Sequence, residues 1–164
     1  MRNARDDGVT VRLATEDDAA LLLELNREVQ ALHATAEPGR FKPVVTETAP
    51  FVAMLSAPEA HTYIAAVAGA PAGYAHIVVQ RRPESPFTYA ATIVHIDQIA
   101  VCSTHRRHGV STALIGRAKA LAAELATDHV TLEVWSFNTV AQTFFASQGF
   151  TTYTERRRLT SREG

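Results

Sequence analysis

The sequence contains almost no cysteine and no long hydrophobic run, and each absence excludes a class of protein. Its 164 residues include a single cysteine, Cys102, so no disulfide bond can form within the chain. This usage fits a reducing compartment, and we expect a cytoplasmic location. No apolar run reaches the roughly 18 residues that a transmembrane helix requires. The opening segment MRNARDDGVTVRL also lacks the apolar core of a signal peptide, so we expect no membrane partner.

Net charge is almost absent as well. The formal net charge is -1 and the isoelectric point is about 6.7, whereas non-specific nucleic-acid binding depends on a broad basic surface. We therefore expect no nucleic-acid partner. The chain contains neither G-x-x-x-x-G-K-[ST] nor G-x-G-x-x-G. The absence of these two motifs argues against a P-loop that binds ATP and against a Rossmann turn that binds NAD.

The patterns that are present describe one globular domain, which we take to be residues 1–164. Hydrophobic residues make up 46% of the chain, enough for a sizeable core. Hydrophobic periodicity predicts strands at 9–15, 61–68, 74–80, 89–102, 129–136 and 150–160, and helices at 15–34, 46–57, 110–126 and 138–148. A hairpin implies antiparallel pairing, and strand–helix–strand units imply parallel pairing. The order βααβββαβαβ therefore predicts a mixed sheet with helices on both faces, in the α/β (α+β) class.

Individual residues mark the expected ends and faces of these elements. Thr15 is the expected N-cap of the first helix, and Gly149 is the expected C′ residue of the last one. The segment Gly-Ala-Pro-Ala-Gly at 69–73 is the expected hairpin turn, and the strand at 89–102 is apolar enough to be buried on both faces. The first helix carries an apolar stripe, which consists of Leu21, Leu22, Leu25, Val29 and Leu32.

A basic cluster stands where the helix at 110–126 begins. His105, Arg106, Arg107 and His108 follow a buried strand, and Gly109 comes next. A helix N-terminus carries unpaired N–H groups and about half a positive charge, and glycine lets a ligand approach the backbone closely. The cluster therefore suits a polyanion such as a pyrophosphate. The alternative is a patch of solvated surface charge.

Two blocks of sequence resemble motifs of the GNAT superfamily of N-acetyltransferases. The segment DQIAVCSTHRRHGVSTALI resembles the acetyl-CoA motif [QR]-x-x-G-x-[GA], except that Ser111 stands at its last position. The segment NTVAQTFFASQGF resembles the helix N-x-x-A-x-x-F-[YF]-x-x-x-G-F near the C-terminus. Both blocks lie at the family's spacing, and the predicted order of elements matches the family's fold over nearly the whole chain.

The resemblance implies a fold and an activity. The fold is a mostly antiparallel central sheet with two splayed parallel strands at the cofactor site. The activity is that of an acyltransferase, which transfers an acetyl group from acetyl-CoA directly to a primary amine of a small molecule or a protein. Acetyl-CoA is then the co-substrate, and no metal is expected. Members of the family are often dimers, so a homodimer is expected here by analogy alone.

The resemblance also implies which residues hold the cofactor. Backbone groups of Ile99, Ala100 and Val101 would pair with the pantetheine arm. Asn138 stands where the family often contacts the cofactor or an ordered water, although a helix N-cap is an equally good role for asparagine. The pyrophosphate would be held by Arg106, Arg107, His108, Gly109, Val110, Ser111 and Thr112.

The catalytic candidates are His95 and Asp97, which alternate onto the same face of their predicted strand. A free alkyl amine has a pKa of about 10.4, so fewer than roughly one molecule in a thousand is neutral at pH 7, and a base assists attack. Some members of the family carry acid–base residues at these positions. The alternative is a satisfied core pair or a strand-edge position. Glu133 is a third candidate, which is more often a paired or solvated strand residue.

Phe145 departs from the family pattern, because many members have there a tyrosine that protonates the departing thiolate. A thiol with a pKa near 8.5 leaves tolerably well without such an acid. An acyl-CoA-binding module with little or no transferase activity is therefore the alternative function. The tyrosines that could replace the missing acid are Tyr63, Tyr74, Tyr89 and Tyr153.

The acceptor site is expected beside the segment LHATAEPGRFKPV, between the first two helices. His33 and Phe41 are the substrate candidates, with Glu37 and Arg40 beside them. A solvated loop with one aromatic anchor is the alternative. Trp135 is more often a core residue than a cleft residue, and the basic tail ERRRLTSREG reads as a solvated strand end.

Overall fold

The computed structural model describes residues 8–160. Residues 1–7, which open the segment examined for a signal peptide, and residues 161–164 of the basic tail lie outside the described part. The chain divides into a unit that ends at Glu133 and a smaller unit that begins at Val134, and each is described by itself. The single domain expected from the sequence stays a prediction.

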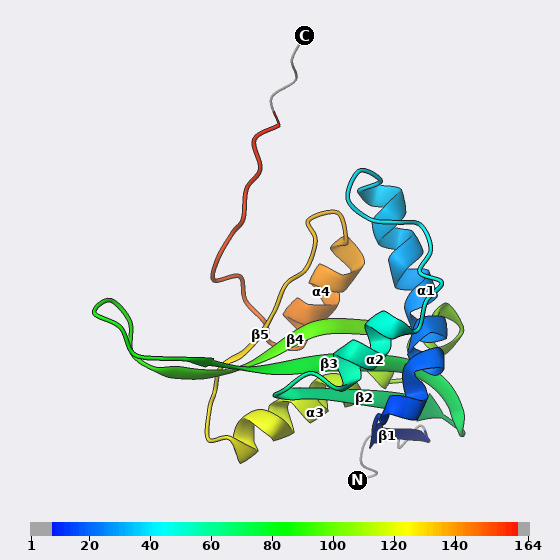
Figure 1. Ribbon diagram of the computed structural model, residues 1–164, viewed down its shortest axis with the longest axis horizontal. Helices are drawn as coiled ribbons and strands as arrows, with labels where there is room; N and C mark the ends of the chain where they lie inside the picture. Colours follow the sequence, from blue (N-terminus) through cyan, green and yellow to red (C-terminus); the bar gives the residue numbers. More distant parts are fainter. Residues whose placement is uncertain (1–7, 161–164) are drawn as a thin grey trace. The chain divides into compact units, whose positions relative to one another are not determined.

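Five strands and four α-helices make up the described chain (Figure 1). The strands are β1 (Val9–Leu13), β2 (Ala60–Val67), β3 (Ala70–Arg82), β4 (Ala91–Val101) and β5 (Val130–Leu132). The helices are α1 (Ala19–Ala36), α2 (Ala49–Leu55), α3 (Val110–Glu124) and α4 (Thr139–Ser147), with 3-10 turns η1 (Glu16–Asp18) and η2 (Ser103–His105).

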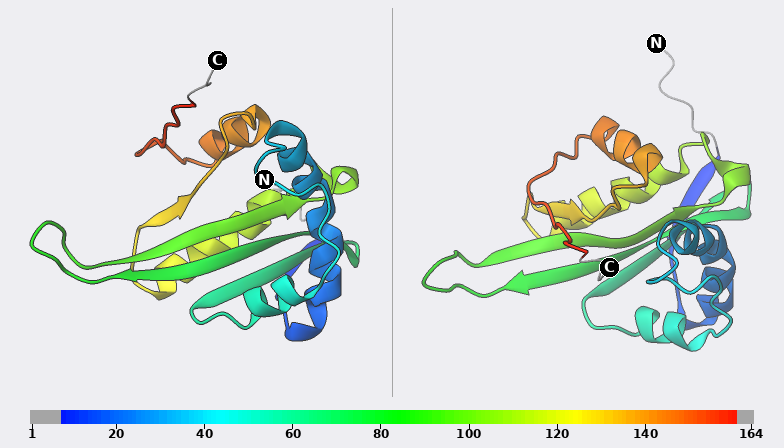
Figure 2. Two further views of the ribbon diagram at one scale, coloured as in Figure 1. Left: turned by 45° about the horizontal axis from the view of Figure 1, so that its top comes forward. Right: turned by 90° about the horizontal axis from the view of Figure 1, so that it is seen from above.

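The strands form one mixed sheet in the order β1-β2-β3-β4-β5. The first three pairings are antiparallel, and the pairing of β4 with β5 is parallel. The right-hand view of Figure 2 shows α1 and α2 on one face of this sheet and α3 on the other. The predicted mixed, mostly antiparallel sheet with helices on both faces is therefore confirmed.

Apolar side chains fill the space between the sheet and its helices. On the face of α1 and α2, the buried cluster consists of Ala19, Leu22, Leu25, Phe51, Ile64, Tyr74 and Ala100. Helix α3 buries Val110, Leu114, Ile115, Ala118, Leu121 and Ala122. The predicted stripe of α1 is confirmed at Leu22 and Leu25, but Leu32 is 46% exposed. Leu32 was wrongly included because it lies near the end of α1, beyond the part that packs on the sheet.

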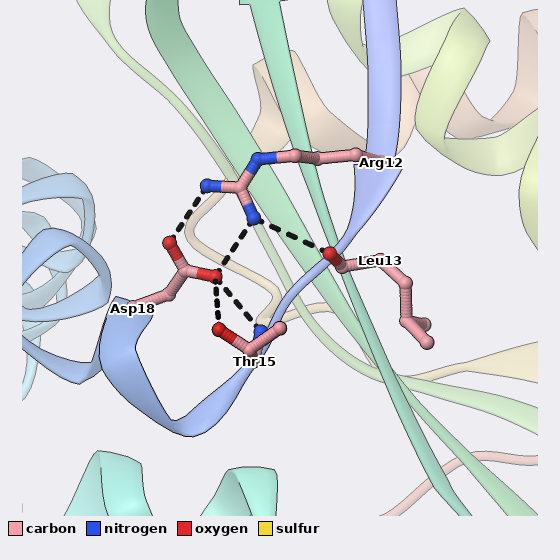
Figure 3. A network of polar contacts seen from close by, with 4 residues as sticks. All are labelled: Arg12, Leu13, Thr15 and Asp18. Atoms are coloured by element: carbon pink, nitrogen blue, oxygen red, sulfur yellow. Dashed lines mark hydrogen bonds and ion pairs between the residues drawn. The ribbon is translucent and has the colours of Figure 1, made fainter.

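The junction between β1 and α1 contains a polar network (Figure 3). Thr15 caps the 3-10 turn η1, which precedes α1, rather than α1 itself. The carboxylate of Asp18 accepts a hydrogen bond from the backbone N–H of Thr15 at 2.8 Å and forms a two-pronged ion pair with Arg12 at 2.7 and 2.8 Å. This network fixes the direction in which the chain leaves β1.

The hairpin between β2 and β3 is tighter than the sequence suggested. The turn is Ala68 and Gly69, both with positive φ, and β3 already begins at Ala70. Pro71 is therefore a strand residue and not a turn residue. Its pairing with Ala66 is followed by a shift of register, and such a bulge is a place where a strand tolerates proline.

The C-terminal strands also differ from the prediction. β5 covers only Val130–Leu132 of the predicted 129–136. The predicted strand at 150–160 is wrong, because residues 151–160 are exposed and the segment joins no ladder of the described chain. Its run of charged residues at 155–158 leaves no alternating apolar face to bury.

Helix α4 has the ends that the sequence predicts. The side chain of Asn138 accepts a hydrogen bond from the backbone N–H of Ala141 at 3.1 Å, which is an N-cap. At the other end, Gly149 has φ +92°, and the N–H of Phe150 donates to the carbonyl of Phe145 at 3.1 Å. This is the Schellman arrangement expected for a glycine at C′.

Candidate active site

The pairing of β4 with β5 ends abruptly, halfway along β4. Its last register pair joins Ile96 to Leu132. From Asp97 to Val101, β4 keeps β3 on one side and has no neighbouring strand of the described chain on the other. The predicted splay of the two parallel strands is thus confirmed. An unpaired strand edge offers backbone N–H and C=O groups to an extended ligand, and Ile99–Val101 lie on this edge.

A β-bulge lies at the point where the strands separate. His76 of β3 pairs with Gln98, and Ile77 pairs with Ile96, so Asp97 has no partner on β3. Bulges bend a strand and redirect its side chains, and they are common beside active sites. Val94, Ile96 and Ala100 are buried as predicted for this strand, whereas Asp97 and Gln98 are exposed. The expectation of burial on both faces is therefore wrong at the bulge.

Asp97 acts electrostatically on two buried groups of β3. The pKa of Tyr74 is raised to about 12, mainly by burial and to a smaller extent by the charge of Asp97, against a hydrogen bond from Asn26 that lowers it. Burial lowers the pKa of His76, and Asp97 opposes this. His76 shares a hydrogen bond of 2.8 Å with the hydroxyl of Thr62. The Asp97 carboxylate is thus the solvent-facing member of a polar group on the α1 face.

His95, the other catalytic candidate, is hydrogen-bonded to a side chain of β5. Its Nδ1 lies 2.9 Å from Oγ1 of Thr131, the residue with which it pairs in the sheet. In the sheet, His95 pairs with Val78 of β3. Val78 is on the same face of β3 as His76 and Tyr74, because the three residues are two positions apart. His95 therefore belongs to the same face as Asp97, but it is half-buried while Asp97 is exposed.

A hydrogen-bonded chain of three side chains crosses the α1 face beside the bulge. Asn26 Nδ2 donates to the hydroxyl of Tyr74 at 2.8 Å, and that hydroxyl donates to Oε1 of Gln98 at 2.7 Å. Tyr74 is fully buried. Sequence reasoning named Tyr74 only as one of several tyrosines and missed Asn26 and Gln98. Gln98 had one signal, a polar residue inside a mostly apolar strand, whereas Asn26 lies among the charged residues of α1 and had none.

The loop after β4 has a backbone suited to anion binding. Arg107 and Gly109 have φ +65° and +78°, the left-handed region. Gly109 is the N-cap of α3 and provides no side-chain cap for the first turn. A Cβ on Gly109 would meet nothing within 4 Å, so the backbone there is open to a ligand. The amides of Val110, Ser111 and Thr112 open the helix, and this donor set fits the pyrophosphate of CoA.

Two side chains position this loop. The carboxylate of Glu28 in α1 accepts hydrogen bonds from the backbone N–H and the hydroxyl of Ser103 at 3.0 and 3.1 Å, and it lies 3.7 Å from the guanidinium of Arg106. Nδ1 of His108 lies 2.9 Å from the carbonyl oxygen of Arg106. No sequence pattern indicated this role for Glu28, because its partner lies 75 positions further along the chain.

A shallow pocket of about 250 Å³ lies along α1. Its lining residues are Leu23, Asn26, Arg27, Gln30, Ala31, Pro43, Val44 and Val45. The substrate candidates His33 and Phe41 are not among them, although the structure brings their rings together with centroids 5.0 Å apart. The guanidinium of Arg40 lies 5.8 Å from the centre of the Phe41 ring. Burial lowers the pKa of His33.

The remaining aromatic candidates divide by exposure. Tyr89 and Tyr153 are 86% and 78% exposed. Tyr63 is buried, with the guanidinium of Arg117 4.8 Å from its ring centre. In the smaller unit, Phe145 is buried against Phe150 at a centroid distance of 5.9 Å, which is a packing role. Trp135 stacks on Phe137 at 5.8 Å within the same unit.

The described residues hold no group of three or more His, Cys, Asp or Glu side chains that could bind a metal ion. Within the same residues, none of the helices has the length and apolar character needed to cross a membrane.

Comparisons with known proteins agree with the geometry. The family model described as "Acetyltransferase (GNAT) family" matches residues 26–150. A tetramutant of the BH1408 protein from Bacillus halodurans has a similar structure, with a TM-score of 0.88 and 19% identity over 93% of this chain and 99% of that one. No curated protein sequence matches the chain.

Two aminoglycoside acetyltransferases have similar structures as well. Meta-AAC0020 from an uncultured soil metagenomic sample, in complex with sisomicin, has a TM-score of 0.68 and 16% identity over 97% of this chain and 99% of that one. Aminoglycoside N-acetyltransferase AAC(6')-Iy in complex with CoA has a TM-score of 0.69 and 18% identity over 99% of this chain and 100% of that one. At these identities the likeness concerns the fold alone.

Proposed function

The chain belongs to the GNAT family of acetyltransferases, and from this premise we propose that it transfers the acetyl group of acetyl-CoA directly to a primary amine. Acetyl-CoA is the co-substrate of this family. The proposed acceptor is a small molecule, because the pocket along α1 has a volume of only about 250 Å³.

The observation that carries this proposal is the continuity of the open β4 edge with the loop before α3. The edge runs from Asp97 to Val101, and the left-handed loop and the uncapped start of α3 follow within a few residues. At about 3.3 Å per residue, this edge is roughly 15 Å long. An anion site and an exposed carboxylate therefore stand at opposite ends of a strand edge that can pair with an extended arm.

Asp97 is the proposed general base. Bound acetyl-CoA supplies a thioester carbonyl carbon, to which the amine nitrogen bonds while the carbon–sulfur bond breaks and the thiol is released. Asp97 is exposed at the bulge and takes the proton that the amine loses, directly or through water. His95 is held by Thr131 and orients the strand end beside it. Phe145 offers no proton, so the thiolate leaves unassisted and is protonated by solvent.

Release of free thiol from acetyl-CoA in the presence of a panel of primary amines tests the proposal. Wild type is expected to release thiol in an amine-dependent way, and mass spectrometry is expected to find the acetylated amine. Asp97→Asn should lower kcat/KM by about 100-fold or more, the usual contribution of a general base. Asp128→Asn, which changes a carboxylate that is 98% exposed just before β5, should have no effect.

Amine-independent binding of acetyl-CoA without thiol release would contradict this function. It would favour instead an acyl-CoA-binding module, the alternative that the phenylalanine at position 145 supports. Equal activity of Asp97→Asn and wild type would contradict the role of Asp97 as general base, but it would not contradict the transferase function.

A further inference from the structure

The side chain of Tyr74 is fully buried, and its hydroxyl has two hydrogen-bond partners, Asn26 and Gln98. Its hydroxyl has a single hydrogen, which is donated to Oε1 of Gln98. The hydroxyl must therefore accept from Asn26, and Nδ2 of Asn26 donates to it. These two bonds fix the rotation of both amides: Oδ1 of Asn26 and Nε2 of Gln98 are directed away from Tyr74.

The outward ends of these two amides have no partner in the part of the chain that the structure describes. No residue there donates to Oδ1 of Asn26, and none accepts from Nε2 of Gln98. Asn26 also lines the pocket along α1, and Gln98 follows Asp97 at the bulge. A hydrogen-bond acceptor and a hydrogen-bond donor are therefore held between the pocket and the proposed base.

The pocket offers little to a molecule that carries several positive charges. Arg27 is the one ionisable side chain that lines it, and its guanidinium lies 2.9 Å from the carboxylate of Glu24. The other lining residues are aliphatic or carry neutral amides, and Gln30 donates its amide to the carbonyl of Lys42 at 2.6 Å. An apolar body suits this lining, and a polycation would meet no carboxylate in it.

We propose, on the basis of the proposed function, that Tyr74 is a positioning residue for an acceptor with one amine and an apolar body. The body lies in the pocket along α1, the Asn26 carbonyl accepts a hydrogen bond from the amine, and Gln98 keeps the Tyr74 hydroxyl, and through it the Asn26 amide, in this orientation. Tyr74 touches neither substrate and acts through the two amides. Its hydroxyl is fully buried and its one hydrogen is donated to Gln98, so Tyr74 does not replace the missing tyrosine acid.

Tyr74→Phe is the direct test, because the ring is retained and only the hydroxyl is lost. Tyr63→Phe is the matched control. Tyr63 is also buried, but its partner in the register is Ala75, so it faces α3 on the opposite side of the sheet. The probes are 2-phenylethylamine, a monoamine with an apolar body, and spermidine, a flexible polycation.

In kinetics, wild type should prefer 2-phenylethylamine over spermidine. Tyr74→Phe should raise the KM for 2-phenylethylamine by about 5- to 10-fold, as expected for the net loss of one hydrogen bond, with the KM for acetyl-CoA unchanged. Tyr63→Phe should leave both values unchanged. A preference for spermidine would overturn the substrate class. Equal KM values in wild type and Tyr74→Phe, or equal increases in both tyrosine variants, would overturn the positioning role.

A binding experiment separates this inference from the proposed function. In 15N-labelled protein, 2-phenylethylamine should shift the side-chain amide resonances of Asn26 and Gln98 in wild type and Tyr63→Phe, and not in Tyr74→Phe. Shifted resonances without any acetylated product would overturn the transferase function and leave the binding site standing. Acetylated product with unmoved resonances would overturn the binding site and leave the function standing.

Discussion

The carboxylate of Asp18 stabilises the junction that precedes α1, the helix that contains Asn26 and Glu28. Its carboxylate is held by both terminal nitrogens of Arg12 and by the backbone N–H of Thr15 (Figure 3). The hydrogen bond from Arg12 is the largest cause that lowers the pKa of Asp18 from 3.8 to about 2. The ionised form is therefore favoured in the folded protein relative to the unfolded chain.

Asp18→Asn should reduce the free energy of unfolding at pH 7 by roughly 1 to 2 kcal/mol, a range that allows for the solvent exposure of Arg12. Because the folded pKa lies below the unfolded one, this stabilisation is present above about pH 4 and is lost as the pH falls toward 2. Urea unfolding between pH 7 and 3 should show a flatter dependence in Asp18→Asn. Asp17→Asn, beside it and exposed, should behave like wild type; an equal loss in both variants would contradict the role of the network.

Local sequence patterns identify some of the proposed site residues and not others. Asp97 could be proposed from the sequence because it is an acidic residue inside an apolar strand. The partnership of Asn26, Tyr74 and Gln98 is not visible, since its two bonds join residues 48 and 24 positions apart. Those bonds exist only after β3, β4 and α1 have packed together, and no pattern in one element specifies them.

At the scale of elements, periodicity and capping residues predicted most of the fold. α3 begins at Val110 as predicted, and the N-cap and C′ residues of α4 are confirmed. The errors lie where pairing with a neighbouring strand determines whether a segment forms a strand. The segment 150–160 belongs to no ladder of the described residues, and Pro71 lies in β3 beside a bulge. The bulge at Asp97 arises from pairing as well and has no signature in β4 alone.

The N-cap of α4 gives a prediction at this scale. Asn138→Ala removes the acceptor for the backbone N–H of Ala141 and should cost about 1 kcal/mol of stability. Asn138→Asp keeps an acceptor oxygen and should stay within a few tenths of a kcal/mol of wild type. Hydrogen exchange at the Ala141 amide measures the effect locally. Equal protection of that amide in Asn138→Ala and wild type would show that the cap does not stabilise the helix.

At the scale of the whole molecule, the two family motifs supply different things. The motif at 106–111 predicted a helix start with unpaired N–H groups beside Gly109, and the structure shows an uncapped start there, with left-handed backbone at Arg107 and Gly109. The motif at 138–150 predicted a helix with defined ends, which the smaller unit contains. The proposed acceptor pocket lies outside both motifs, because it combines residues of α1 with residues 43–45.

The central claim is that the start of α3 binds the phosphates of acetyl-CoA, and thermal unfolding with and without acetyl-CoA tests it most directly. Gly109→Ala introduces the backbone strain of φ +78°, and Gly109→Glu adds a negative charge where anions should bind. Gly69→Glu is the matched control, because Gly69 has φ +83° and open space around it, in the hairpin turn between β2 and β3.

At about 100 times its dissociation constant, acetyl-CoA should stabilise wild type by about 2.7 kcal/mol. Gly69→Glu should start from a lower melting temperature and show the same increase, Gly109→Ala should keep part of the increase, and Gly109→Glu should lose it. No increase in folded wild type, or an undiminished increase in Gly109→Glu, would contradict the assignment of the cofactor site.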